Sequence, residues 1–152
     1  DDVLEHVTIL PFNELAAARK ILEDNKDQLA AVIVEPLMGS VGMIPGTHEF
    51  LGMLRDFTQD NGIILIFDEV ISFRVAPGGC QEYYGVTPDL TSLGKIIGGG
   101  FAVGAFGGRR GRSLEPERST GSVGKRCERE RGGVRPARVG SRARWEGFAR
   151  YR

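Results

Sequence analysis

Hydrophobic residues recur at helical spacing in two segments of the first half of the chain. The first segment, residues 12–25, reads FNELAAARKILEDN, and Asn13 is the expected N-cap of a helix there. The apolar positions that share one face of this helix are Leu15, Ala18, Ile21 and Leu22. The second segment, residues 46–62, reads GTHEFLGMLRDFTQDNG, with Thr47 near its start and Gly62 as its stop. Its apolar face consists of Phe50, Leu54 and Phe57.

Apolar runs of strand length lie between and after these helices. Residues 30–36 read AAVIVEP and residues 63–70 read IILIFDEV, both without polar alternation. Such runs are typical of strands buried on both faces, in a parallel sheet covered by helices. Residues 89–93, DLTSL, predict a short third strand, and residues 101–106, FAVGAF, offer a fourth. This order of elements predicts the α/β class, with a mostly parallel sheet and flanking helices.

Charged side chains stand where three of these strands end, at Glu35, Asp68 and Lys95. Ligands of open α/β sheets bind beyond the carboxyl ends of the strands, so this shared placement is a functional signal. Asp68 and Lys95 also have ordinary structural interpretations. Asp68 fits an ion pair or a helix cap, and Lys95 fits a solvated lysine in the glycine-rich stretch TSLGKIIGGG. The functional interpretation is covalent catalysis, because a partly buried lysine has a lowered pKa and its free amine attacks carbonyl groups.

A lysine of this kind forms a Schiff base with pyridoxal phosphate in many enzymes, and an acidic side chain then faces the pyridinium nitrogen. Asp68 is the candidate for that acid. Its negative charge would keep the ring nitrogen protonated, so that the ring accepts electrons from a carbanion at the α-carbon of the substrate. The glycines beside Lys95 would let the backbone pass close to a flat cofactor. The lysine is not part of a G-x-x-x-x-G-K-[ST] phosphate loop, since Ile96 follows it.

Two longer motifs carry a resemblance to a known family. Residues 65–109 read LIFDEVISFRVAPGGCQEYYGVTPDLTSLGKIIGGGFAVGAFGGR, and residues 32–46 read VIVEPLMGSVGMIPG. Both resemble the class III pyridoxal-phosphate-dependent aminotransferases, and among these most of all the aminomutases. The resemblance implies that residues 1–110 are part of the large domain of a fold-type I transferase. It also implies a small amino-acid or amine substrate, and a homodimer for the full-length family member.

The resemblance assigns roles to individual residues of this chain. It implies that Lys95 forms the Schiff base and later moves a proton, that Asp68 pairs with the pyridine nitrogen, and that Val70 packs against the cofactor ring. Ser40 stands where the family often has Asn or Glu near the ring oxygen, so it is a further candidate cofactor contact. Glu35 matches the end of a strand in the family, where it is expected to support the site.

The sequence also departs from the family. DEVISFR, residues 68–74, is one residue shorter after the valine than the frequent DEVxTGFR, which bears on substrate choice. The phosphate-binding turn and stacking aromatic residue that the family has upstream, and its intersubunit threonine segment downstream, are not found in this sequence. We therefore expect weak cofactor occupancy, poor solubility and no measurable transamination by residues 1–152 alone. The alternatives are a transaminase acting on another amino acid or amine, and a non-catalytic α/β remnant with a basic binding tail.

The zero net charge conceals two dissimilar parts. Residues 1–110 contain 8 Lys/Arg and 15 Asp/Glu, whereas residues 111–152 contain 12 and 5. The second part includes 11 Arg and 7 Gly and no Ile, Met, Asp, Asn, Gln or His. Nucleic-acid binding, a disordered solvated tail and an out-of-frame translation all fit this composition. We favour the out-of-frame interpretation, because the resemblance stops at Arg109 or Arg110, and we expect no nucleic-acid partner.

Several other classes of protein are disfavoured by the sequence. Cys80 and Cys127 do not make a disulfide framework, and no C-x-x-C pair or metal-ligand cluster is present, so we expect a cytoplasmic protein without a metal. No apolar run approaches the roughly 18 residues of a membrane span, and the first residues lack the pattern of a signal peptide. The first residue is not methionine, so we expect that the chain begins inside something longer or was trimmed.

Overall fold

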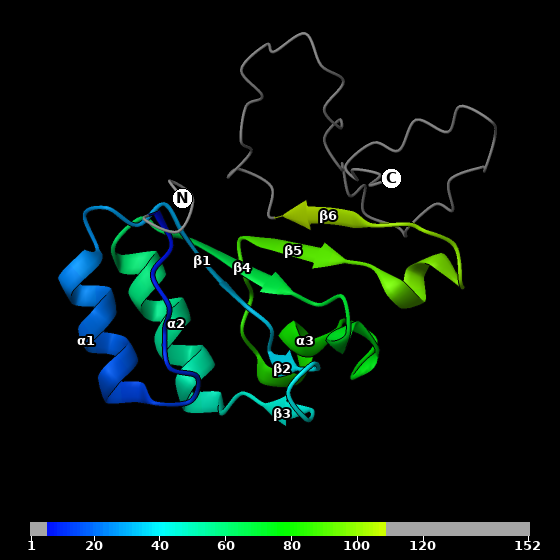
Figure 1. Cartoon of the computed structure of the whole chain (residues 1–152), viewed down its shortest axis with the longest axis horizontal. Helices are drawn as coiled ribbons and strands as arrows, with labels where there is room; N and C mark the ends of the chain where they lie inside the picture. Colours follow the sequence, from blue (N-terminus) through cyan, green and yellow to red (C-terminus); the bar gives the residue numbers. More distant parts are fainter. Residues whose placement is uncertain (1–5, 109–152) are drawn as a thin grey trace, which may run out of the picture.

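The central sheet has four strands in the order β1-β4-β5-β6 (Figure 1). The computed structural model describes residues 6–108 of the chain. The strands are β1 Ala31–Val34, β4 Ile64–Asp68, β5 Leu90–Leu93 and β6 Ala105–Gly108. β1, β4 and β5 run parallel to one another, and β6 runs antiparallel to β5. The predicted α/β class with a mostly parallel sheet is therefore confirmed.

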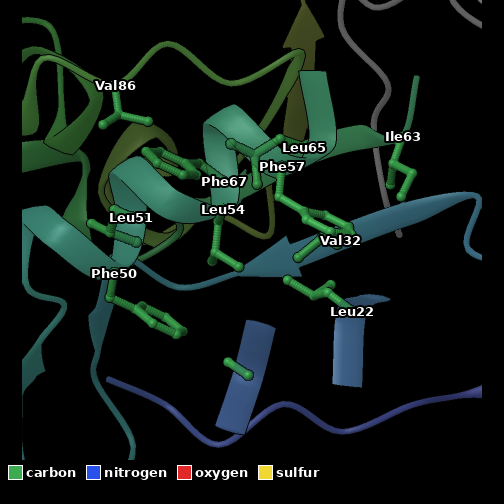
Figure 2. Close-up of a cluster of buried hydrophobic side chains, with 11 residues drawn as sticks. Leu22, Val32, Phe50, Leu51, Leu54, Phe57, Ile63, Leu65, Phe67 and Val86 are labelled. Atoms are coloured by element: carbon green, nitrogen blue, oxygen red, sulfur yellow. The ribbon is translucent and has the colours of Figure 1, made fainter. Parts of the chain in front are cut away.

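Two helices form a layer against this sheet. α1 is Leu15–Asn25 and α2 is His48–Asp60, and α2 packs on both β1 and β4 while α1 packs on α2. Figure 2 shows the cluster of side chains that these elements bury between them. Its members are Ala18, Leu22, Val32, Phe50, Leu51, Leu54, Phe57, Ile63, Leu65, Phe67 and Val86. Full burial stabilises each large apolar side chain by about 1.5–3 kcal/mol relative to exposure, so this cluster fixes β4 and the residues that follow it.

The two helices begin differently. The Oγ1 atom of Thr47 accepts a hydrogen bond from the amide of Phe50 at 3.1 Å, so Thr47 is the N-cap of α2, and its predicted place near the start of this helix is confirmed. The prediction for Asn13 is wrong, because α1 begins at Leu15 and its N-cap is Glu14. Asn13 has φ 63° and uses its side chain at long range, donating to the carbonyl of Pro45 at 3.0 Å and accepting from the amide of Thr47 at 2.9 Å. It therefore ties the entrance of α1 to the entrance of α2.

The prediction that the strands are buried on both faces is wrong within residues 6–108. The helices cover the face of Val32, Leu65 and Phe67, whereas Ile33 on the opposite face is 65% exposed. Ile33 pairs in register with Ile66, and Ile66 pairs with Leu90, so the uncovered face is a continuous apolar surface. The apolar composition of these strands predicts burial on both faces, but no described segment packs over the face of Ile33.

Short elements connect the main strands. A two-stranded antiparallel sheet of β2, Leu37–Met38, and β3, Ile44–Pro45, lies between β1 and α2. The short 3-10 helix η2, Ser72–Arg74, and the short α-helix α3, Cys80–Tyr84, connect β4 to β5. A second 3-10 helix, η3, Lys95–Gly98, follows β5. The predicted strand at residues 101–106 begins later, at Ala105. Within residues 6–108, no helix is both long enough and apolar enough to cross a membrane.

Candidate functional site at the carboxyl edge of the sheet

The ends of three parallel strands bring the predicted charged residues to one edge of the sheet. Val34 pairs with Phe67, so Glu35 leaves β1 at the level where Asp68 ends β4. Asp68 in turn pairs with Ser92 of β5, and Lys95 follows Ser92 by three residues. The predicted shared edge is confirmed. It results from the parallel register, which aligns the carboxyl ends of neighbouring strands.

Asp68 and Val70 are fixed by local contacts at this edge. The Oδ1 atom of Asp68 accepts a hydrogen bond from the amide of Val70 at 3.0 Å, which turns the chain directly after β4. Val70 then lies against Gly94, where an added Cβ would be 3.2 Å from its Cγ1 and 3.3 Å from its Cγ2. A side chain at position 94 would therefore push Val70 away by a few tenths of an ångström. The turn after β4 therefore touches the residue directly before Lys95.

Lys95 occupies a backbone conformation that is unfavourable for a residue with a side chain. Its φ is 44°, in the left-handed region, where a non-glycine residue costs on the order of 1–3 kcal/mol. It is the first residue of η3, and Gly98, Gly99 and Gly100 close the turn. The side chain is exposed rather than partly buried as predicted, because no part of residues 6–108 covers it.

A cavity of about 610 Å³ opens on the uncovered face beside this lysine. Val70, Gly94, Lys95 and Phe106 line it near the carboxyl edge, and Ile66 and Leu90 are apolar residues of its wall farther along the sheet. Val70 and Lys95 therefore line one cavity. Asp68 does not line the cavity, although it lies in the chain between two residues that do.

The structure places Ser40 apart from this cavity. Ser40 is exposed in the connection between β2 and β3, and it does not line the cavity. The neighbouring Gly39 donates its amide to Oε2 of Glu35 at 3.1 Å and lies against the side chain of Ile71. Glu35 therefore holds the connection between β2 and β3, and its expected role in supporting the site stays a prediction. Nothing in residues 6–108 brings Ser40 into contact with Lys95.

Two residues at the edge were not singled out by the sequence. Phe106 lines the cavity because β6 folds back beside β5, and its partner in the register is Ser92. Glu69 is completely buried next to the half-exposed Asp68. The sequence feature that could have indicated the burial of Glu69 is the pair Gly78 and Gly79, because glycine lets another group approach the backbone closely.

The edge residues fit the ring end of a pyridoxal phosphate molecule. A pyridine ring that carries an aldehyde needs an amine for the aldehyde, an anion for the ring nitrogen and an apolar surface for its face. Lys95 carries an amine, Asp68 an anion and Val70 an apolar side chain, and the three stand at adjoining strand ends. No group of three or more His, Cys, Asp or Glu side chains in the described part of the chain has the geometry of a metal site.

The fold and this edge define an α/β protein with a lysine, a carboxylate and an apolar side chain at the ends of neighbouring parallel strands. The family model of class III aminotransferases matches residues 6–119. The chain belongs to the class III aminotransferase family.

Individual relatives agree with this family. The glutamate-1-semialdehyde 2,1-aminomutase of Methanococcus maripaludis is 49% identical over 111 residues, which are 72% of this chain and 26% of that protein. An omega-transaminase from Sphaerobacter thermophilus is 51% identical, with a TM-score of 0.70, over 72% of this chain and 25% of that one. A solved transaminase with pyridoxal phosphate bound is 37% identical, with a TM-score of 0.65, over 68% of this chain and 24% of that one. The chain thus spans about a quarter of the length of these relatives.

Proposed function

We propose that this chain carries the lysine edge of a pyridoxal phosphate site in an enzyme that moves amino groups. The observation that carries the proposal is the register of β4 and β5, which pairs Asp68 with Ser92 and sets Lys95 three residues farther on. The related transaminase with bound pyridoxal phosphate supports the choice of cofactor. When bound, this cofactor supplies an electron sink for a carbanion at the α-carbon of an amino acid or amine.

The residues of the chain have distinct proposed roles. Lys95 would hold the aldehyde of the cofactor through its amine and would carry a proton to and from the substrate carbon. Asp68 would keep a proton on the ring nitrogen, and its hydrogen bond from the amide of Val70 fixes the turn that presents this apolar side chain. Ser40 remains a proposed contact to the ring oxygen; to take this role, the connection between β2 and β3 has to approach the cavity.

The proposed reaction is the aminomutation of glutamate-1-semialdehyde, on the basis of the aminomutase relatives. A second candidate is transamination of another amine or amino acid. It is supported by the omega-transaminase, whose 51% identity lies within the range of 47% to 56% found among the aminomutase relatives. For the whole protein we propose a homodimer in the cytoplasm that takes a small-molecule substrate.

The division of the chain at residue 110 is also a proposal. Residues 1–110 are proposed to belong to the cofactor-binding large domain, and the composition of residues 111–152 supports an out-of-frame or disordered tail. The family match extends to residue 119, so the exact boundary needs a direct test. The nucleotide sequence around codon 110, read in all three frames, provides it. The tail lies outside the described residues.

Absorbance spectroscopy tests the cofactor proposal. Adding pyridoxal phosphate to the purified chain is expected to produce the visible absorbance band of a Schiff base, and Lys95→Arg is expected to remove most of it. Arginine keeps the positive charge but does not form this bond, so the variant separates covalent binding from charge attraction. An equal band in the parent chain and in Lys95→Arg would contradict the assignment. To separate the two reactions, the whole protein is offered glutamate-1-semialdehyde and, in a parallel assay, an amine donor with a keto-acid acceptor.

A further inference from the structure

The buried carboxylate of Glu69 has no cation beside it within the described part of the chain. The ion pairs among residues 6–108 join Lys20 to Asp24, Lys26 to Glu23, and Arg55 to Asp89. Glu69 takes part in none of these three ion pairs. Its side chain is nevertheless 0% exposed. A buried charge of this kind is tolerated only where hydrogen-bond donors surround it.

Four donors converge on this carboxylate. The Oε2 atom of Glu69 accepts from the amide of Cys80 at 2.6 Å and from the hydroxyl of Ser72 at 3.4 Å. The Oε1 atom accepts from the side-chain Nε2 of Gln81 at 3.2 Å and from its amide at 3.4 Å. All of these groups belong to the segment that connects β4 to β5. The carboxylate therefore closes this segment onto the end of β4.

The backbone at Gly79 is shaped around the same carboxylate. Gly79 has φ 79°, and a Cβ on it would be 2.5 Å from Oε2 of Glu69 and 2.8 Å from Oε1. A side chain at this position would collide with the carboxylate as well as strain the backbone. The glycine and the buried glutamate thus fit each other, although ten residues separate them.

The same carboxylate is connected to the strand that leads to Lys95. The Nε2 atom of Gln81 also lies 3.4 Å from Oγ1 of Thr91 in β5, while it donates to Glu69. On the backbone, the amide of Glu69 donates to the carbonyl of Ser92 at 3.0 Å, one step beyond the end of β4. Glu69 is thereby joined to β5 through its amide and through Gln81.

We propose that Glu69 is a positioning residue that holds the turn of Asp68 and Val70 at a fixed place relative to Lys95. It does so by anchoring the Cys80–Gln81 backbone and, through Gln81, the strand before the lysine. Glu69 stands between Asp68 and Val70 in the chain, so a displacement of its backbone also displaces both neighbours. This inference rests on the proposed function, because it gives the spacing of these groups a catalytic purpose.

Glu69→Gln is the sharpest test, because glutamine keeps the size but replaces one acceptor with a donor. Every group around the carboxylate donates, so at least one buried donor loses its acceptor. We expect amide hydrogen exchange of Cys80 and Gln81 to rise roughly tenfold, exchange across 91–95 to rise several-fold, and exchange across 63–67 to stay nearly constant. Fixation of pyridoxal phosphate on Lys95 by borohydride is expected to fall several-fold. Glu82→Gln, on an exposed side chain of the same short helix, is the matched control and should change neither measurement.

Thr91→Val provides a second variant that leaves Glu69 and its backbone partners in place. It removes the acceptor of Gln81 on β5, so exchange across 91–95 should rise and fixation on Lys95 should fall, while exchange of Cys80 and Gln81 stays unchanged. If Glu69→Gln does not fold, Thr91→Val alone tests the proposed role of Glu69. The proposal is overturned if either variant leaves exchange across 91–95 and fixation on Lys95 as in the parent chain. Absence of fixation in the parent chain would contradict the proposed function instead, and the exchange measurements would still decide the role of Glu69.

Discussion

Asp89 and Arg55 form a buried ion pair that fixes the start of β5, and its removal is a quantitative test of the fold. The Oδ2 atom of Asp89 accepts from Nη1 of Arg55 at 3.1 Å and from the amide of Leu65 at 2.9 Å. The amide of Asp89 donates to the carbonyl of Leu65 at 2.8 Å. The two side chains are 3% and 11% exposed. β5 is thus attached to both β4 and α2 ahead of Lys95.

Asp89→Ala is expected to lower the free energy of unfolding by about 3–5 kcal/mol, because a buried charge and a buried amide both lose an acceptor. Arg55 would keep only its hydrogen bond to the carbonyl of Thr87, at 3.2 Å, and its Nε atom already has no acceptor within the described residues. A loss of this size is a large part of the roughly 5–15 kcal/mol that stabilises a typical domain.

Urea unfolding followed by circular dichroism measures this loss. The unfolding midpoint should move to lower urea while the slope with urea stays the same. Asp24→Asn is the control, because it removes an exposed ion pair to Lys20, and it should leave the midpoint unchanged. A loss below about 1 kcal/mol for Asp89→Ala would refute the reasoning, since it would place this pair in the range of exposed ones.

Three further predictions follow from single contacts. Thr47→Ala should destabilise the fold by about 1 kcal/mol in the same urea assay, because α2 loses its N-cap, whereas Thr47→Ser should retain most of that stability. Burial, followed by the negative charge of Glu69, raises the pKa of Cys80, so its alkylation by iodoacetamide should need a higher pH than that of a small free thiol; an equal pH profile would contradict the burial. Asp68→Asn in the whole protein should keep the Schiff base on Lys95 but reduce turnover by orders of magnitude; if Asp68 only caps a turn, stability falls by about 1 kcal/mol and turnover is kept.

The features that could be predicted from the sequence are those set by neighbours in the chain. The start of α2 near Thr47 and the burial of Phe50 and Leu54 depend on residues within one or two helical turns, so local spacing was sufficient. The shared edge of Asp68 and Lys95 was predictable because parallel strands align their carboxyl ends. These features position the candidate site.

The features that escaped prediction depend on residues distant in the sequence. Asn13 is held by groups 32 and 34 residues away, which no local capping rule includes. The exposure of Ile33 depends on what covers the sheet, and hydrophobicity reports the tendency to be buried rather than the covering segment. The contacts of Glu69 reach across the connection to Cys80, so an acidic pair after a strand gave no indication of them.

The most direct test of the central claim identifies the lysine that binds pyridoxal phosphate. The chain is incubated with the cofactor, reduced with borohydride and digested, and the modified peptide is identified by mass spectrometry. The account predicts that the modification is found on Lys95, because this lysine lies in the cavity beside Val70 and at the strand end next to Asp68. A modification spread over Lys20, Lys26 and Lys125, or absent from Lys95, would contradict the account.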